Sequence, residues 1–166
     1  MEIDKTLTPT RRKILLSGSV FYSILLILMC LTPQLVLEGA PETPGIRHFG
    51  RLVVLLIPFN SLVNLGQITS WFQLIKVVVQ NLANIFLIFP LILQLLFLFP
   101  TLRQIKRVLI LGFGLSLFIE CSQLILDYLW DFNRVFEIDD LWTNTLGAYL
   151  ALLVYNLFIN KRNVRK

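Results

Sequence analysis

The sequence predicts an all-α fold, namely a four-helix transmembrane bundle with a re-entrant or interfacial segment between the first two spanning helices. Of the 166 residues, 56% are hydrophobic and only 15% are charged, and the mean hydropathy is +0.75. A water-soluble domain has about a quarter charged residues, so the excess apolar surface indicates a lipid environment. Four apolar runs are each long enough to cross a bilayer as a helix. These runs, 14–31, 82–99, 108–125 and 141–159, define one membrane domain over 14–159.

The first apolar run, 14–31, follows the polar segment 1–13, whose last three residues are basic. We interpret the run as a spanning helix that stays in the protein, with 1–13 on the cytoplasmic side. A cleaved signal peptide is the alternative, but the run is longer than a usual signal core. The residues after the run also lack a small-x-small cleavage site.

Two segments between the first and second runs are predicted to lie at the membrane surface or partly within it. The apolar segment 52–59 follows a loop rich in Pro and Gly, 32–50, and is closed by Pro58. A helix of this length cannot span a bilayer, so we expect a re-entrant or interfacial segment. Residues 67–80 place apolar side chains at helical spacing, with Trp71 expected near the headgroups. A loop helix in water is the alternative for 67–80.

Basic residues flank the apolar runs in a pattern that predicts the orientation of the protein. Most of the 15 Lys and Arg residues fall in the segment 1–13, the turn 100–107 and the tail 160–166. With four spans, the second kinked at Pro90 and the last two joined by an acidic loop at 126–140, all three segments lie on one side. The positive-inside rule makes that side the cytoplasm. We therefore expect a multi-pass protein of the cell membrane with both termini cytoplasmic.

The net charge of +5 does not indicate nucleic-acid binding. The basic residues form short clusters beside apolar runs, which is the pattern expected for contact with anionic lipid headgroups. A nucleic-acid interface would also need an exposed basic surface with stacking aromatic side chains, whereas most aromatic residues here lie inside the apolar runs. Membrane lipid is therefore the expected partner.

The sequence predicts no metal site and identifies no cofactor. Cys30 and Cys121 lie far apart within predicted spans, so we interpret both as small buried side chains and not as a disulfide or zinc site. His48 falls in a loop without metal-ligand spacing and is expected to be exposed to solvent. The chain also lacks a Gly-rich phosphate loop, a Ser-centred nucleophile elbow and a zinc motif.

The strongest functional signal is a set of charged and amide residues within or beside the apolar runs. A carboxylate in a spanning segment costs about 3 kcal/mol or more unless it is paired or hydrated. Glu120, Gln123 and Asp127 share one helix face because they are spaced i, i+3 and i+7. Polar residues of the second and fourth runs fall at the same depth, which predicts a polar pocket open to the outer face. The candidate pocket residues are Asn84, Glu120, Gln123, Arg134, Asp139, Asp140 and Asn144.

Each of these residues also has a structural interpretation. Asp139 and Asp140 lie at the N-terminus of the fourth helix, where either is suited to capping. Arg134 is placed to pair with one of them or with an anionic headgroup. Glu120 is alternatively a buried pair or a protonated carboxyl group, and the amides are alternatively hydrogen bonds between helices. Gly147 is expected to allow the close approach of a second helix.

Several motifs resemble the VanZ-like family of bacterial membrane proteins. They are IPFN (57–60), QNLANIFLIFP (80–90), the pair Glu120 and Gln123, and RVFEIDDLWTNTLG (134–147). Their combined order and spacing are specific, and the resemblance covers roughly residues 47–155. Family members usually carry a Gly shortly after the Pro of the second motif. This chain has Leu91 and Ile92 there, so a helix-packing contact is expected to differ.

The resemblance implies a cell-envelope role in a bacterium, because the family's founding member is associated with low-level resistance to teicoplanin, a glycopeptide with a lipid tail. It supplies no catalytic residues. The favoured hypothesis is that the pocket binds an amphiphile, either a lipid-linked cell-wall precursor or a lipoglycopeptide. The alternative is a membrane enzyme that modifies a lipid-linked envelope substrate with paired carboxylates. A transporter is less favoured because the polar residues are confined to one leaflet.

Overall fold

The computed structural model of the protein describes residues 7–34, 44–64, 66 and 71–164. The predicted N-terminal segment, the loop at 32–50, the helix at 67–80 and the basic tail therefore lie partly outside the described residues. Helices make up most of the described chain, as the all-α prediction requires.

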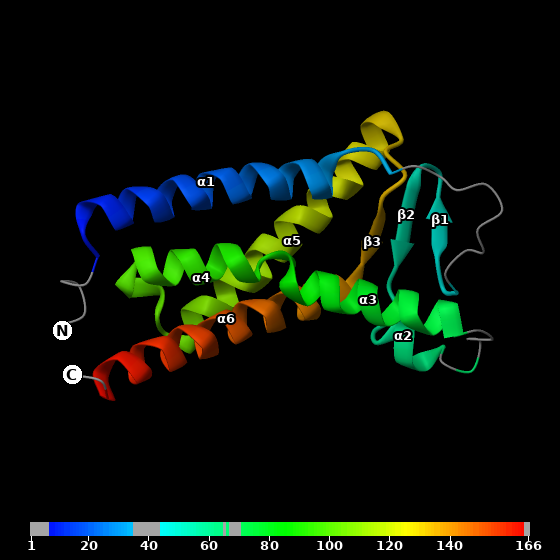
Figure 1. Cartoon of the computed structure of the whole chain (residues 1–166). Coiled ribbons are helices and arrows are strands. Elements are labelled where there is room, and N and C mark those ends of the chain that lie inside the picture. Colours follow the sequence, from blue (N-terminus) through cyan, green and yellow to red (C-terminus); the bar gives the residue numbers. More distant parts are fainter. Residues whose placement is uncertain (1–6, 35–43, 65, 67–70, 165–166) are drawn as a thin grey trace.

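Four helices are long and apolar enough to cross a membrane, which confirms the predicted number of spans. They cover Pro9–Leu31, Val77–Leu98, Ile105–Trp130 and Ile138–Asn160. In Figure 1 they correspond to α1 (Pro9–Leu31), α3 (Trp71–Leu87) with α4 (Phe89–Leu98), α5 (Ile105–Trp130) and α6 (Ile138–Val164). The four lie along one another as a bundle, which identifies a multi-pass membrane protein.

The second span is broken where the sequence predicts a kink. α3 ends at Leu87 and α4 begins at Phe89, so that Pro90 lies in the first turn of α4. Proline has no backbone N–H, and its ring clashes with the carbonyl one turn earlier, so a straight helix cannot continue through it. The Tyr22 hydroxyl of α1 donates to Leu87 O at 2.8 Å, which satisfies a carbonyl at the break.

A small sheet, which the sequence did not predict, caps one end of the bundle. Its strands are β1 (Arg47–Phe49), β2 (Leu52–Leu55) and β3 (Val135–Glu137). The middle strand, β2, pairs antiparallel with β1 and parallel with β3. The segment expected to be re-entrant or interfacial therefore begins as a strand and continues into the short helix α2 (Asn60–Val63). A short apolar run cannot be assigned to a strand or a helix by periodicity alone, and Val53 and Val54 favour the strand.

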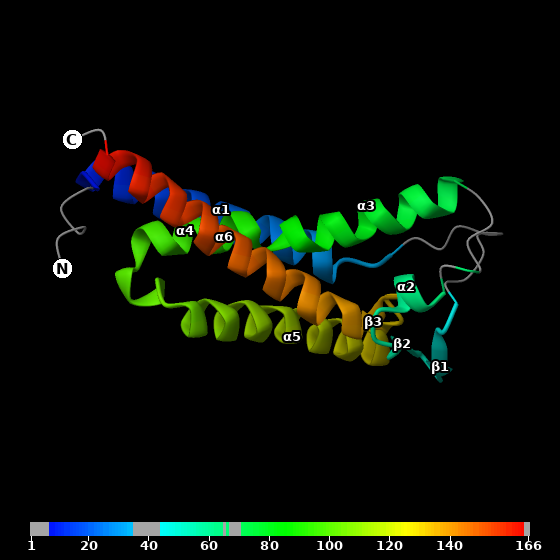
Figure 2. The same ribbon diagram turned by 90° about the horizontal axis from the view of Figure 1, so that it is seen from below.

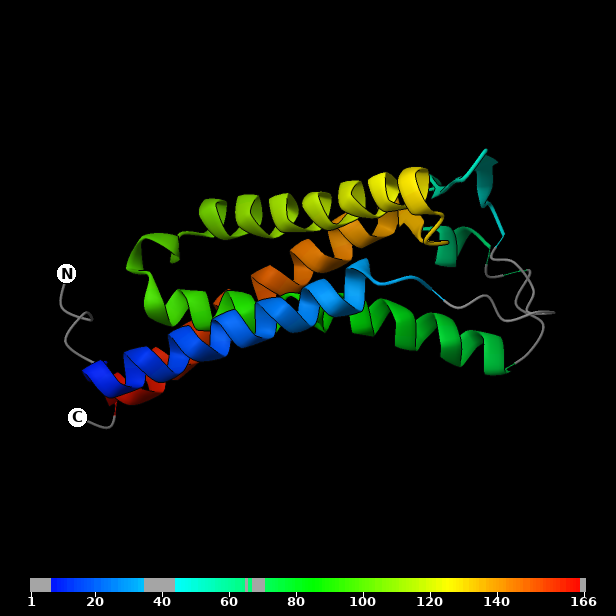
Figure 3. The same ribbon diagram turned by 90° about the horizontal axis from the view of Figure 1, so that it is seen from above.

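The two ends of the bundle differ in chemistry. Figures 1, 2 and 3 show both chain termini and the turn between α4 and α5, which includes η3 (Pro100–Leu102), at the end opposite the sheet. Of the predicted basic clusters, the described side chains at that end are Arg11, Arg12 and Lys13 in the first turns of α1, Arg103 after η3, and Lys106 and Arg107 in the first turn of α5. All three tryptophans lie toward the sheet end, since Trp71 begins α3, Trp130 ends α5 and Trp142 lies in the first turns of α6.

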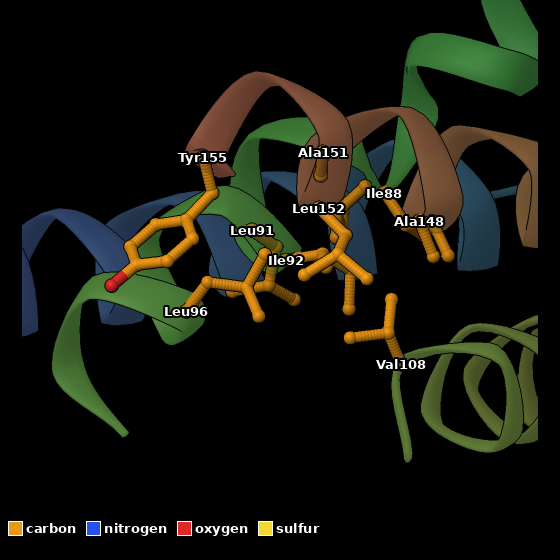
Figure 4. Packing of buried hydrophobic residues seen from close by; sticks show 10 residues of the cluster. Ile88, Leu91, Ile92, Leu96, Val108, Ala148, Ala151, Leu152 and Tyr155 are labelled. Atoms are coloured by element: carbon orange, nitrogen blue, oxygen red, sulfur yellow. The ribbon is translucent and has the colours of Figure 1, made fainter. Parts of the chain in front are cut away.

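The apolar core occupies the half of the bundle nearer the termini. Ile88, Ile92 and Leu96 pack there with residues of α5 and α6, as Figure 4 shows. At the end of this core, the Arg103 guanidinium lies 5.1 Å from the ring centre of Tyr155 and donates from Nε to Leu96 O at 3.0 Å. The core therefore fills the bundle with apolar side chains from its middle to the basic end.

Two glycines allow α6 to approach its neighbours closely. A Cβ at Gly147 would overlap the carbonyl oxygen of Ile85 in α3. A Cβ at Gly112 of α5 would lie 2.5 Å from the Cβ of Ala148. These contacts place α3 and α5 directly against α6, and so they fix where the polar residues of the three helices meet.

Candidate functional site

The polar residues of α5 and α6 form successive layers along the contact between these antiparallel helices. One helical turn along α5 toward its C-terminus therefore corresponds to one turn along α6 toward its N-terminus. Gly112 faces Ala148, then Ser116 Oγ accepts a hydrogen bond from Asn144 Nδ2 at 2.9 Å, and then Glu120 meets Asp140. The contact thus changes from apolar to polar toward the sheet end.

The centre of the site is a pair of carboxyl groups from different helices. Glu120 and Asp140 form a side-chain hydrogen bond with each other. An ionised carboxylate can only accept hydrogen bonds, so this contact needs one proton on the pair. Glu120 is 2% exposed, and its Oε2 accepts from the backbone N–H of Glu137 at 3.0 Å. Asp140 Oδ1 accepts a hydrogen bond from Asn84 Nδ2 of α3.

Three helices therefore bring together three of the predicted pocket residues, Asn84, Glu120 and Asp140. Asn144 lies one turn further along α6 and connects to them through Ser116, whose hydroxyl donates to Asp140 O at 3.0 Å. Asn144 is 1% exposed, and its Oδ1 has no hydrogen-bond partner among the described residues. This layer closes the polar region on the side of the apolar core.

Glu137 belongs to the same cluster, although the sequence did not identify it. It is the last residue of β3, and its Oε1 accepts from Nε2 of Gln80, an exposed residue of α3, at 3.2 Å. Burial, together with the neighbouring Asp140 and Asp139 carboxyl groups, raises the pKa of Glu137 to about 7 from 4.5. No sequence pattern shows which way the Glu137 side chain points. The pairing of β3 with β2 turns this side chain toward α3.

This raised pKa predicts a pH dependence of stability. Between about pH 4.5 and pH 7 the folded protein holds a proton on Glu137 that the unfolded chain has lost. The free energy of unfolding must therefore fall as the pH rises through this window. We expect thermal unfolding in detergent to occur at lower temperature at about pH 8 than at about pH 5, and Glu137→Gln to reduce the difference. An identical pH dependence in this variant would contradict the assignment.

Asp139 performs a different task from its neighbour Asp140. Its Oδ1 accepts from the Phe59 backbone N–H at 2.7 Å and from the Trp142 indole N–H at 2.9 Å. Its Oδ2 accepts from the Asn60 backbone N–H at 2.8 Å. Asp139 therefore holds the start of α2 on α6, and both its oxygens are occupied by this contact.

Gln123 and Arg134 act on α1 in this structure. Gln123 Nε2 donates to Cys30 O at 2.9 Å. The Arg134 guanidinium donates from Nη2 to Met29 O at 2.7 Å and from Nε to Thr32 O at 2.9 Å. The predicted partners of Arg134 were the two aspartates or a headgroup, whereas its observed partners are carbonyls at the C-terminal end of α1.

Asp127, on the same face of α5 as Glu120 and Gln123, is fully buried. Its Oδ1 accepts from the backbone N–H of Arg134 at 2.9 Å, which closes the loop between α5 and β3. Two residues of this loop, Asp131 and Asn133, have positive φ angles of 57° and 55°. Asp127 therefore shapes the turn that delivers Arg134 to α1.

The structure also places the remaining chemically reactive residues. His48 is exposed, as expected, but it lies in β1 and not in a loop. Both cysteines are free, and Cys30 is buried as predicted, but Cys121 is exposed on the outer face of α5, so the expectation of burial was wrong for it. Within the described part of the chain, no group of three or more His, Cys, Asp or Glu residues is arranged to hold a metal ion.

The fold and the site together define a class, a four-span helical membrane protein with a carboxyl and amide cluster near one end of its bundle. The sequence matches the VanZ/LLP1 family over residues 19–159, and the chain belongs to this family. Comparisons with curated proteins and with solved structures gave no match. At Leu91 and Ile92, where the chain departs from the family motif, both side chains are buried in the core.

Proposed function

We propose that this protein binds the polar head of an amphiphile at the cluster formed by Asn84, Glu120, Glu137 and Asp140, and that this binding serves the cell envelope. The observation that carries the proposal is the convergence of carboxyl groups from α5, β3 and α6 at one depth of the bundle. Glu120 is buried, whereas Glu137, Asp140 and Asn84 are partly exposed. A ligand can therefore approach the three partly exposed side chains and reach the buried carboxyl group of Glu120 beside them.

The proposed orientation places the sheet end at the outer face and both termini in the cytoplasm. The basic clusters at the terminal end follow the positive-inside rule. The three tryptophans toward the sheet end are suited to the lipid–water interface, where Trp is enriched. The cluster then lies in the outer leaflet, where lipid-linked cell-wall precursors and lipoglycopeptides are presented.

The chemistry of the cluster restricts the head group that it accepts. Carboxylates accept hydrogen bonds, and the amides of Asn84 and Gln80 already donate to carboxyl oxygens. The remaining capacity consists mostly of acceptors, so the ligand should offer hydroxyl, amide or amino donors. Sugar and peptide portions of an amphiphile meet this requirement better than an unscreened phosphate does.

The packing of the bundle argues against passage of a solute through a single copy. From Asn144 toward the end of the bundle that holds the termini, the contact between α5 and α6 becomes apolar, with Gly112 against Ala148. The core residues Ile92, Leu96 and Val108 are fully buried and fill the half nearer the termini. A polar path across the bundle would have to cross this apolar half, which is costly for polar groups.

An enzyme that modifies the bound amphiphile is the second candidate, and one observation favours it. Two carboxyl groups that share a proton provide one acid and one base, as general acid–base catalysis requires. Glu120 and Asp140 are each held by an additional donor, the Glu137 N–H and the Asn84 amide. This alternative adds product formation to the binding proposed above.

The test is teicoplanin and vancomycin susceptibility of a host that expresses the wild type, Glu120→Gln, Asp140→Asn or Asn144→Ala, with membrane abundance measured for each. We expect Glu120→Gln and Asp140→Asn to accumulate normally and to weaken protection against the lipid-tailed drug selectively. Asp131→Asn is the matched control, because it neutralises a carboxylate near the same end, outside the cluster, in a left-handed conformation that Asn tolerates.

Two outcomes would separate the candidates. Partial loss of protection without a new lipid product supports binding alone. Complete loss together with a product found only in wild-type lipid extracts supports the enzyme. Full protection by both carboxyl variants at wild-type abundance would contradict the proposed site.

A further inference from the structure

The C-terminal end of α1 is held by donors from outside the helix. The last carbonyls of any helix have no partner within it and need donors from elsewhere. α1 has no basic residue in its last turn, and its own contribution is a bond from Thr32 Oγ1 to Leu28 O at 2.7 Å. The carbonyls of Met29, Cys30 and Thr32 are instead satisfied by Arg134 and Gln123.

These donors are suited to hold a helix end. A guanidinium is favoured beside the partially negative C-terminus of a helix, and a hydrogen bond from a charged donor is stronger than one from a neutral donor. Arg134 comes from the loop between α5 and β3, and Gln123 comes from α5. The end of α1 is therefore attached to the segment that also carries Glu120.

The attached end of α1 forms one side of the carboxyl cluster. Cys30 is 6% exposed, and its backbone carbonyl contacts Gln123, which lies about one turn along α5 from Glu120 on the same buried face. The outward residues Ile27, Leu28 and Met29 are more than half exposed, so this turn of α1 has lipid-accessible surface on one side and the cluster on the other. Figures 1 and 3 show that α3 extends beyond this end of α1 toward the sheet.

We propose that the end of α1 is a lateral gate, that Arg134 and Gln123 hold it closed over the Glu120–Asp140 pair, and that its release admits the amphiphile from the outer leaflet. The ligand part of this inference rests on the proposed function, while the gate itself does not. Arg134 and Gln123 are positioning residues, since they act on the site through α1 and not by contact with the carboxyl pair.

The test measures how fast N-ethylmaleimide labels the Cys30 thiol in native membranes. Cys121→Ser provides a full-length background in which Cys30 is the single cysteine. We expect slow labelling in this background and labelling roughly tenfold faster with Arg134→Ala, which removes two hydrogen bonds from a charged donor. Arg134→Lys should fall between the two, because a lysine can donate to these carbonyls without the planar fork of a guanidinium.

Gln123→Met gives an independent measurement, since it keeps the length of the side chain but removes the donor to Cys30 O. We expect it to accelerate labelling also. Arg51→Ala is the matched control, because Arg51 likewise donates to a helix-end carbonyl, Leu129 O at 3.5 Å, but on α5. Its labelling rate should equal that of the background.

Unchanged labelling in Arg134→Lys, Gln123→Met and any accumulating Arg134→Ala protein would overturn the gate. This result would leave the proposed function standing if Glu120→Gln still lost protection. Accelerated labelling with full protection by Glu120→Gln would instead support the gate and contradict the ligand site.

Discussion

Replacement of Gly147 by alanine is expected to abolish accumulation of the folded protein in the membrane. The new Cβ would overlap Ile85 O and lie 2.9 Å from Ile85 C, and both atoms belong to the backbone of α3. A backbone cannot move aside as a flexible side chain can, so α3 and α6 must separate. We expect a loss of about 3 kcal/mol or more in the free energy of unfolding. Membrane abundance and thermal unfolding in detergent measure the effect.

Gly114→Ala is the matched control for this prediction. Gly114 also lies inside a spanning helix, but a Cβ there would meet nothing within 4 Å. Alanine is favoured over glycine in a helix by about 1 kcal/mol, so this variant should be as stable as the wild type or slightly more stable. If both variants accumulate alike, α3 and α6 do not meet at Gly147 as the structure shows.

Gly147 also affects the site, because Asn84 and Asp140 lie on the two helices that meet at this glycine. Gly147 lies two turns from Asp140 along α6, and Ile85 follows Asn84 directly in α3. The contact at Gly147 therefore sets the distance across which Asn84 donates to Asp140. A variant that separates the two helices is expected to lose the amide contact together with the packing.

Composition and periodicity predicted the membrane class because these properties are local and additive along the chain. Four apolar runs, the kink at Pro90 and the basic clusters all depend on neighbouring residues, and the corresponding spans agree with the structure. The fixed rise per residue of a helix predicted that Asn84, Glu120 and Asn144 lie at one depth. In the structure Glu120 meets Asp140, and Asn144 lies one turn further along α6 against Ser116.

The sequence could not predict the features that depend on rotation and register. Leu52–Leu55 pairs with Val135–Glu137 across about half of the chain, and no local pattern specifies that partner. The sheet turns Glu137 toward α3, so a residue interpreted as part of an acidic loop becomes a member of the cluster. The partners of Arg134 could not be predicted for a similar reason. They are backbone carbonyls at the end of α1, and every residue type has a backbone carbonyl.

The adjacent residues Asp139 and Asp140 show most clearly how the structure divides roles that the sequence left open. Both were candidates for a helix cap and for the pocket. One helical step turns Asp139 toward Phe59 and Asn60, and Asp140 toward Glu120 and Asn84. Replacement of Asp139 should therefore lower the stability of the protein, whereas replacement of Asp140 should impair its function.

Asp139→Ala is expected to lower the free energy of unfolding by about 3 kcal/mol, because the backbone N–H groups of Phe59 and Asn60 each lose a charged acceptor. Asp139→Asn should cost about half as much, since one oxygen remains. Asp140→Asn should leave stability nearly unchanged, because an amide still accepts from Asn84 and donates to Glu120. Thermal unfolding of each variant in detergent and drug susceptibility of the host that expresses it distinguish the two residues.

Normal stability in Asp139→Ala would show that α2 does not depend on this carboxylate. Loss of stability in Asp140→Asn would show that the Glu120–Asp140 pair holds the bundle together, and the site would then have to be sought elsewhere.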